Sequence, residues 1–230
     1  MSYFNVKKSI LFEDNHLIAV NKPAGILVQG DNTGDKTLSD FIKEYIKKEY
    51  NKPGDVYLGT IHRLDRPVSG VILFAKTSKA LTRMNAMFQD GSIRKTYVAL
   101  LQKKPRQLSE DLTHWLVKLQ DKNVTKAFEK EVKNSKKSML TYNYIATANH
   151  KFLVEIHLKT GRSHQIRAQL AKIGTPISGD LKYGSRKGKG SFIYLHAKNL
   201  EFIHPVKKEK VILRCPLPEE ENWNFFKEYV

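Results

Sequence analysis

The chain has 230 residues, 40% of them hydrophobic and 10% aromatic, so it can bury a sizeable core and is not expected to be disordered over most of its length. Its 40 Lys and Arg residues outnumber 23 Asp and Glu residues, and the net charge of +17 indicates a polyanionic partner. The only cysteine, Cys215, excludes an intrachain disulfide and a cysteine-cluster metal site.

Two other classes of protein have less support. No stretch approaches the roughly 20 apolar residues that cross a bilayer, and no basic amphipathic helix of the kind that binds an acidic membrane surface stands out. The N-terminal residues 1–10 lack the apolar core of a signal peptide, so we expect a cytoplasmic protein without a membrane partner. A basic protein that is merely soluble remains an alternative to one that binds nucleic acid.

The first half of the chain alternates strand-like and helical patterns. Residues 9–20 predict two short strands joined by a turn, and residues 37–50 predict a helix capped by Thr37 or Ser39. A strand over residues 70–75 is followed by a helix over 78–90, with Ser78 as its predicted N-cap.

The second half is richer in strands. Residues 163–173 predict a last long helix, which precedes a Gly- and Lys-rich loop around residues 179–190. The Lys- and Glu-rich segment 120–137 is interpreted as an exposed hairpin arm or a short helix. The predicted strands are 95–102, 114–120, 139–148, 152–158, 192–197 and 211–215, before a short helix over 222–230. We therefore expect an α+β fold with a mixed, largely antiparallel sheet flanked by helices and loops, in one domain over residues 1–230.

The densest cluster of ionisable residues lies in the loop 61–70. Arg63 and Arg66 flank Asp65, which should therefore be ionised and able to act as a nucleophile or base. The alternative is that Asp65 only pairs with an arginine and caps a turn. His62, beside a strand, is typical of a structural hydrogen-bonding residue.

A second cluster covers residues 159–167, where a glycine-bearing turn enters a helix. Arg162 and His164 are predicted on the first helical turn, whose unpaired amides attract phosphate. Arg167 could reach a buried carboxylate from this helix or remain an exposed surface cation. A third fragment places Tyr97 in a strand after basic residues, where its ring could stack on a base or simply fill the core.

These clusters, in this order, resemble the RluA-type family of pseudouridine synthases. No nucleotide-phosphate, dinucleotide or zinc-protease motif and no GxSxG elbow competes with that resemblance. It is carried by the fragments Phe12-Glu13-Asp14, Val20-Asn21-Lys22-Pro23-Ala24-Gly25, His62-Arg63-Leu64-Asp65, Ser69-Gly70, Lys95 with Tyr97, Gly161-Arg162, His164-Gln165-Ile166-Arg167, Leu195-His196-Ala197 and His204-Pro205.

The resemblance implies the pseudouridine synthase catalytic fold and a role for each motif. Asp65 would be the catalytic aspartate, Tyr97 the aromatic against the target base, and Arg167 the partner of the aspartate. Arg63 would fill the gap that the flipped nucleotide leaves. The residues expected to bind the substrate are His62, Arg63, Arg66, Arg162, His164, Gln165 and Leu195.

The implied reaction moves uracil from an N1 to a C5 linkage on the same ribose, so we expect neither a metal nor another cofactor. Asp65 could add to ribose C1′, add to uracil C6, or abstract a ribose proton. The expected substrate is ribosomal or transfer RNA, the expected state is a monomer, and no separate N-terminal RNA-binding domain is expected. Recognition of the RNA could involve the arm 120–137, which could equally be a solvated charged face.

Two other functions compete with this one. A catalytically silent RNA-binding or ribosome-assembly factor would not need Asp65, Tyr97 and Arg167 together. A glycoside-cleaving enzyme would need two carboxylates, whereas the motifs offer one. The departures from the family pattern are Val68 before Ser69-Gly70, and Phe192-Ile193-Tyr194 where relatives carry an Arg.

Overall fold

The computed structural model describes residues 4–31, 34–121, 123–185 and 192–230. The chain forms two compact units: unit 1 is Met1–Ile93 with Ala197–Pro216, and unit 2 is Arg94–His196 with Leu217–Val230. The single domain that the sequence predicts stays a prediction, which cooperative unfolding of both units would test.

Unit 1 is built on strands that pair in the order β1-β2-β4-β10, with β3 beside β4 and β11 beside β10. The pairs β1–β2, β2–β4, β3–β4 and β10–β11 are antiparallel. Strand β10 begins at Leu195, two residues before Ala197, where the second segment of unit 1 begins. The elements are α1 (Val6–Ser9), β1 (Ile10–Glu13), β2 (Leu17–Lys22), α2 (Leu38–Glu49), β3 (Gly59–Thr60), β4 (Ser69–Ala75), α3 (Ser78–Gln89), β10 (Leu195–Ile203) and β11 (Lys210–Arg214).

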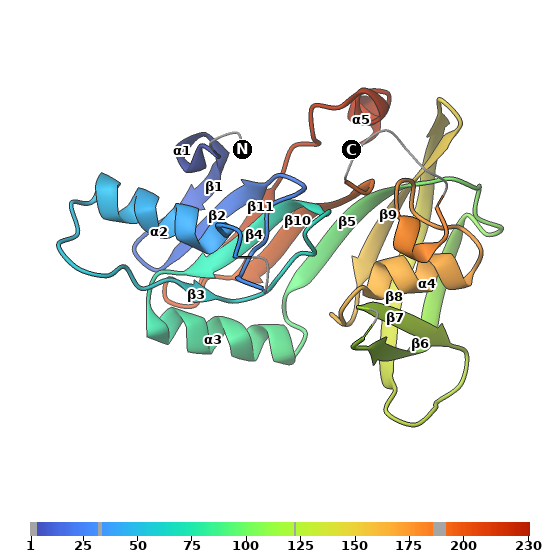
Figure 1. Cartoon of the computed structure of the whole chain (residues 1–230), viewed down its shortest axis with the longest axis horizontal. Coiled ribbons are helices and arrows are strands. Elements are labelled where there is room, and N and C mark those ends of the chain that lie inside the picture. The colour runs from blue at the N-terminus through green and yellow to red at the C-terminus, as the bar shows by residue number, and fades with distance from the viewer. Residues whose placement is uncertain (1–3, 32–33, 122, 186–191) are drawn as a thin grey trace. The chain divides into compact units, whose positions relative to one another are not determined.

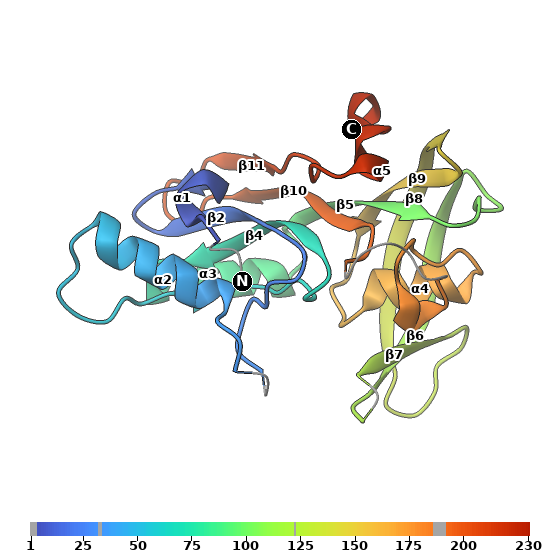
Figure 2. The same ribbon diagram turned by 45° about the horizontal axis from the view of Figure 1, so that its top comes forward.

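The core of unit 1 lies around β2 and β4. Every residue of β4 is buried, and so are all residues of β2 except Asn21. Strands with such continuous apolar runs are covered on both faces, so they need helices packed on the sheet. Figure 1 shows α2 and α3 running alongside these strands, and Figure 2 shows both helices on one side of them.

Local capping fixes where the two helices of unit 1 begin. Thr37 caps α2 as predicted, and a reciprocal hydrogen bond from the Thr37 backbone to Asp40 completes a capping box. The predicted cap of α3 is wrong by one residue, because Thr77, not Ser78, accepts the hydrogen bond from the Ala80 amide. Both residues are good caps, so sequence could not separate them.

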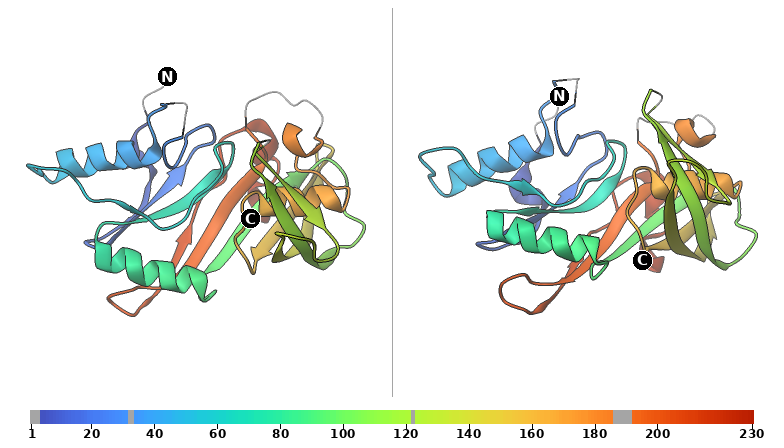
Figure 3. Two further views of the ribbon diagram at one scale, coloured as in Figure 1. Left: turned by 60° about the horizontal axis from the view of Figure 1, so that its bottom comes forward. Right: turned by 90° about the horizontal axis from the view of Figure 1, so that it is seen from below.

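Unit 2 is an antiparallel sheet in the order β5-β9-β8-β6-β7. Burial alternates along β6 and β8, so one face of these strands is covered and the other meets solvent. Figure 3 shows α4 lying across β6 and β7. The elements are β5 (Arg94–Leu101), β6 (Ser109–Leu119), β7 (Val124–Phe128), β8 (Lys136–Ala148), β9 (Lys151–Leu158), α4 (Gln165–Lys172), the 3-10 helices η1 (Leu181–Tyr183) and η2 (Lys227–Tyr229), and α5 (Glu221–Asn224).

The structure confirms the α+β class and the largely antiparallel sheet, and it corrects several local predictions. Within the segment 120–137 the hairpin alternative is confirmed and the helix is wrong: Val124–Phe128 form strand β7, in which Val124 pairs with Leu119 and Phe128 with Trp115 of β6. The short helix α1 and strand β3 were not predicted. The strand predicted over residues 192–197 begins only at Leu195. Part of the Gly- and Lys-rich loop, residues 186–191, lies outside the described residues.

Candidate active site

Asp65 lies in unit 1, on the loop between β3 and β4. Apolar residues anchor this loop on both sides, because Ile61, Leu64 and Val68 are buried while Asp65 itself is half-buried. The Val68 amide donates a 3.0 Å hydrogen bond to the Asp65 carbonyl, which closes a turn at Arg66-Pro67. A rigid turn thus presents the Asp65 side chain.

A fully buried lysine, Lys22, lies beneath the same loop at the end of β2. Its Nζ donates to the carbonyl oxygens of Pro23 at 2.9 Å, Arg66 at 3.2 Å and Val68 at 2.7 Å. Burial lowers the pKa of Lys22 to about 7, an effect that the charge of Asp65 opposes and that of Arg66 reinforces. Lys22 therefore fixes the backbone that follows Asp65 to the end of β2.

Gly70, the register partner of Lys22, is required by a close approach of two strands. Its backbone φ of +122° is a value that residues other than glycine rarely adopt. A Cβ at this position would lie 2.3 Å from the carbonyl oxygen of Ala197 on β10. Any other residue would push the start of β4 away from β10 and disturb the loop that carries Asp65.

His62 begins the loop with contacts that support the structural interpretation. Its Nε2 accepts a 3.0 Å hydrogen bond from the Leu73 amide, so the proton of the neutral ring is on Nδ1. The ring also stacks on Phe88 with centroids 4.9 Å apart. His62 thereby fixes the loop to β4 and α3, and its role in substrate binding stays a prediction.

Arg66 links the Asp65 loop to the loop that follows β2. Its Nε donates to the Gly25 carbonyl at 3.0 Å, its Nη2 lies 2.9 Å from Asp35, and the Gly25 amide donates back to the Arg66 carbonyl at 2.8 Å. The neighbouring Arg63 is exposed, and its predicted role in the RNA stack stays a prediction.

Arg167 lies in unit 2 and is buried, so the alternative of a surface cation is wrong. Its Nε and Nη2 donate to the two carboxylate oxygens of Asp180 at 2.7 and 2.9 Å, and its guanidinium lies over the Tyr183 ring at 5.0 Å. A bidentate pair of this kind fixes the plane of the arginine. Sequence reasoning missed Asp180, because it lies in a segment interpreted only as loop.

Tyr183 joins the turn before α4 to β7. Its hydroxyl accepts a 2.8 Å hydrogen bond from the Thr125 amide and lies 2.9 Å from Nδ1 of His164, and burial raises the pKa of this phenol. Tyr183 was not predicted as a site residue. It is the last residue of the 3-10 helix η1, and Asp180 directly precedes that helix.

The predicted first turn of α4 is wrong at Arg162 and His164, because the helix begins only at Gln165. His164 has a φ of +53°, which is incompatible with a right-handed helix. The buried Gln165 accepts hydrogen bonds from the Arg162 amide at 3.0 Å and the Thr160 hydroxyl at 2.8 Å. Gln165 and His164 therefore determine the shape of the turn that precedes α4 and contains Arg162.

Tyr97 is on β5, opposite Ile156 of β9. It is only partly buried, unlike the fully buried residues from Val98 to Leu101 that follow it, so it is not a core residue. Lys95 precedes it by two residues and therefore lies on the same face of the strand; burial lowers the pKa of that lysine. Leu195, the remaining predicted contact, is buried at the start of β10.

The structure thus arranges the predicted residues in two groups. Asp65, His62, Arg63 and Arg66 belong to unit 1, and Tyr97, Arg162, His164, Gln165, Arg167 and Leu195 belong to unit 2. Within the described ranges, no three His, Cys, Asp or Glu residues gather as a metal site would require. Over the same residues, no helix is long and apolar enough to cross a membrane.

Comparison with known proteins identifies the family of this chain. The family model for RNA pseudouridylate synthases matches residues 16–172, which include Asp65, Tyr97 and Arg167. The chain belongs to the RNA pseudouridylate synthase family. The resemblance to RluA-type enzymes is therefore confirmed, and the chain is an RNA pseudouridine synthase, an isomerase.

Individual relatives match this chain over nearly its whole length. A tRNA pseudouridine synthase C of Vibrio cholerae is 32% identical over 91% of this chain and 91% of its own length. A ribosomal large subunit pseudouridine synthase C of Buchnera aphidicola is 32% identical over 98% of this chain and 71% of its own length. The structure of human RNA pseudouridylate synthase domain containing 4 matches with a TM-score of 0.78 at 22% identity, covering 93% of this chain and 90% of its own, and supports the fold.

Proposed function

We propose that this pseudouridine synthase isomerises a specific uridine in ribosomal or transfer RNA, with Asp65 as its catalytic carboxylate. The observation that carries the proposal is the loop of Asp65, in which the carbonyls of Arg66 and Val68 accept hydrogen bonds from the buried Lys22. The two RNA classes come from the relatives, one of which is named for transfer RNA and another for the large ribosomal subunit.

The proposed roles follow the chemistry of each side chain. The target uridine leaves its stack at a cost of a few kcal/mol, which phosphate contacts of a chain with net charge +17 offset. The carboxylate of Asp65 then adds to ribose C1′ or uracil C6, or takes a ribose proton. Each course breaks the N1 glycosidic bond and forms the C5 bond without net oxidation or reduction.

The remaining side chains position the substrate. The partly exposed ring of Tyr97 lies against the target base, and the exposed Arg63 fills the gap in the RNA stack. Arg167, whose plane Asp180 fixes, is the proposed partner of Asp65. The proposed substrate contacts are His62, Arg66, Arg162, His164, Gln165 and Leu195.

The test is to replace Asp65 by Asn, which keeps the shape and removes the anion. Purified wild type and Asp65→Asn are incubated with total RNA from cells that lack the gene, and new pseudouridines are mapped by carbodiimide adduct sequencing. We expect a discrete site with wild type, none with Asp65→Asn, and similar RNA affinity for both. Asp90→Asn, an exposed carboxylate in the same unit, serves as the matched control and should retain the site.

Two outcomes would contradict the proposal. Wild-type turnover by Asp65→Asn would remove Asp65 from the mechanism. Tight RNA binding by wild type with no new pseudouridine would favour the non-catalytic RNA-binding factor. A monomeric, cytoplasmic enzyme without metal or cofactor stays a prediction, which sedimentation and turnover in EDTA would test.

A further inference from the structure

Unit 1 has a cavity of about 390 Å³ away from the catalytic loop. It lies beyond Ala75, the last residue of β4, whereas the Asp65 loop precedes Ser69, the first. A strand of this length spans roughly 20 Å. The volume falls within the range of roughly 300–1,000 Å³ that is usual for ligand sites. The side chains used below are Asn15, Tyr50, Lys52, Asp55, Tyr57 and Lys76.

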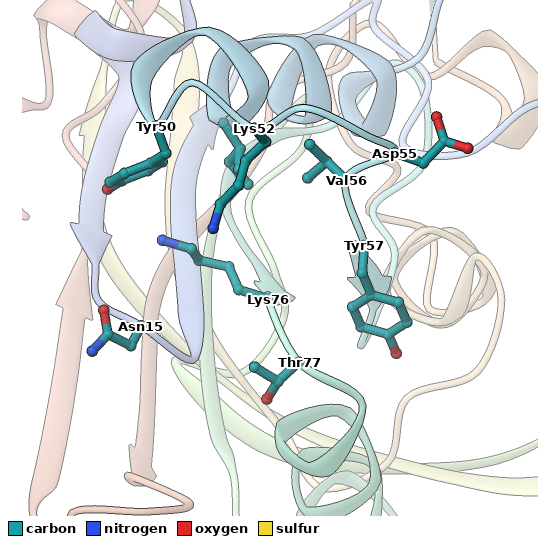
Figure 4. Close-up of a pocket in the computed structure, with 9 residues that line it drawn as sticks. Asn15, Tyr50, Lys52, Asp55, Val56, Tyr57, Lys76 and Thr77 are labelled. Carbon is teal, nitrogen blue, oxygen red and sulfur yellow. The ribbon is translucent and has the colours of Figure 1, made fainter.

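Two lysines extend into this cavity from opposite walls, and their amino groups approach each other (Figure 4). Lys52 is exposed and, among the residues described, its Nζ has neither a hydrogen-bond nor an ion-pair partner. Figure 4 also shows the carboxylate of Asp55 directed away from both amines. Glu13 pairs with Lys76, so the positive charge of Lys52 beside it favours a ligand that carries an anion, such as a phosphate.

Lys76 is held in place by its neighbours. Its Nζ lies 2.6 Å from Glu13 and 4.8 Å from the centroid of the Tyr50 ring, and its side chain is 13% exposed. Glu13 also accepts the Tyr50 hydroxyl at 2.9 Å and the Tyr45 hydroxyl at 3.0 Å, so its charge is fully engaged. Lys76 is thus a fixed cation, whereas Lys52 is able to move toward a ligand.

Two aromatic rings stand at the rim of the cavity. Tyr50 is 47% and Tyr57 48% exposed, so part of each ring is accessible to a base. The hydrogen bond to Glu13 raises the pKa of Tyr50, which keeps the ring neutral. Exposed aromatic faces beside lysines are the combination that single-stranded nucleic acids use, since bases stack and phosphates pair.

The openness of the site favours a segment of a chain over an enclosed small molecule. Half-exposed rings leave the rim of the cavity accessible to a strand of nucleic acid. The flanking helix turns add two exposed lysines, Lys47 at the end of α2 and Lys79 in the first turn of α3. Each extends the positive field along which a phosphate backbone could run.

We propose that this cavity binds one nucleotide of the RNA substrate, several nucleotides away from the target uridine. Its phosphate lies between Lys52 and Lys76, and its base lies against Tyr57 or Tyr50. The inference rests on the proposed function, because the ligand is the RNA that Asp65 modifies. Such a contact would increase affinity and fix the register of the RNA without touching the reacting uridine.

The test measures binding of deproteinised total transfer RNA and of large-subunit ribosomal RNA by wild type and variants between 50 and 200 mM KCl. We expect Lys52→Ala to weaken binding of the substrate RNA roughly 3- to 10-fold and to reduce the slope of log affinity against log salt by about 0.7–0.9. Tyr57→Ala should weaken it about 5-fold or more through lost stacking.

The matched control is Lys48→Ala. It removes the same charge four residues away, at the exposed end of α2 and outside the cavity. We expect its salt slope and its kcat/KM to equal those of wild type, whereas kcat/KM of Lys52→Ala falls in proportion to affinity. A second readout is ultraviolet crosslinking to the same RNA followed by mass spectrometry, which should find a nucleotide adduct on Tyr50 or Tyr57.

Three outcomes would overturn the inference. The first is that both cavity variants keep the RNA affinity and salt slope of wild type. The second is that Lys52→Ala and Lys48→Ala lose RNA affinity equally. The third is that uridine monophosphate forms the crosslink and RNA does not. If wild type makes pseudouridine while the cavity variants bind normally, only this inference fails. If the variants lose affinity but wild type makes no pseudouridine, the proposed function fails and the cavity stands.

Discussion

Each unit buries one cation beside predicted site residues, and the two cations are stabilised in opposite ways. Lys22 in unit 1 is surrounded by three backbone carbonyls, and its burial lowers its pKa to about 7. Arg167 in unit 2 is paired with the buried carboxylate of Asp180. Arginine keeps its charge at any pH the protein meets, whereas lysine loses it when burial is not offset by a full negative charge.

The difference assigns a distinct physical role to each cation. Arg167 and Asp180 form an ion pair whose geometry two hydrogen bonds fix, and the arginine keeps its charge. Lys22 holds a loop through hydrogen bonds whose number depends on its protonation, since an ammonium has three donors and an amine two. The loop of Asp65 should therefore respond to pH through Lys22.

The largest expected effect comes from breaking the ion pair of unit 2. Asp180→Ala leaves Arg167 buried without its carboxylate, which should lower the free energy of unfolding by about 3–5 kcal/mol. Urea unfolding followed by circular dichroism measures it. Asp111→Ala is the matched control, because it breaks the exposed pair with Lys159 and should change stability little. Equal stability of the two variants would contradict the buried pair.

A smaller effect is expected from removing the amine of unit 1. Lys22→Met keeps a long apolar stem but leaves the carbonyls of Pro23, Arg66 and Val68 without their donor, which should cost roughly 1–3 kcal/mol. Because two of these carbonyls, those of Arg66 and Val68, lie in the turn directly after Asp65, kcat should fall as well. Lys8→Met, on an exposed lysine of the same unit, is the control. Unchanged stability and turnover in Lys22→Met would show that the carbonyls find other donors.

The smallest effect is a pH dependence that only Lys22 produces. In the unfolded chain this lysine keeps its proton up to its ordinary pKa of 10.5, whereas in the folded protein it releases it near pH 7. Between those values the unfolded state binds more protons, so rising pH stabilises the folded state, by at most about 1.4 kcal/mol per pH unit.

The measurement compares urea unfolding of wild type and Lys22→Met at pH 7.5, 8.5 and 9.5, values chosen within the window of roughly 7 to 10.5 that the shift defines. Stability of wild type should rise relative to the variant across the series. Parallel curves would mean that the folded protein keeps Lys22 charged, held by its carbonyls and by Asp65.

Several local features could be predicted because they depend on neighbours in sequence. The cap at Thr37 needs only Asp40 three residues later, and the strands β2 and β4 follow from continuous apolar runs. The sequence of the segment 120–137 fits either a hairpin arm or a short helix, and only pairing with β6 decided between them. The left-handed backbone of His164 likewise gave no sequence signal.

The sequence by itself determined the family, the fold class and the residues that the proposed mechanism uses, because the motifs around Asp65, Tyr97 and Arg167 are local strings. Only the tertiary structure revealed what holds them. Lys22 resembles a surface lysine in sequence, and Asp180 lies 13 residues from Arg167. Burial and long-range pairing depend on segments that meet in space, and a string of residues does not record which segments meet.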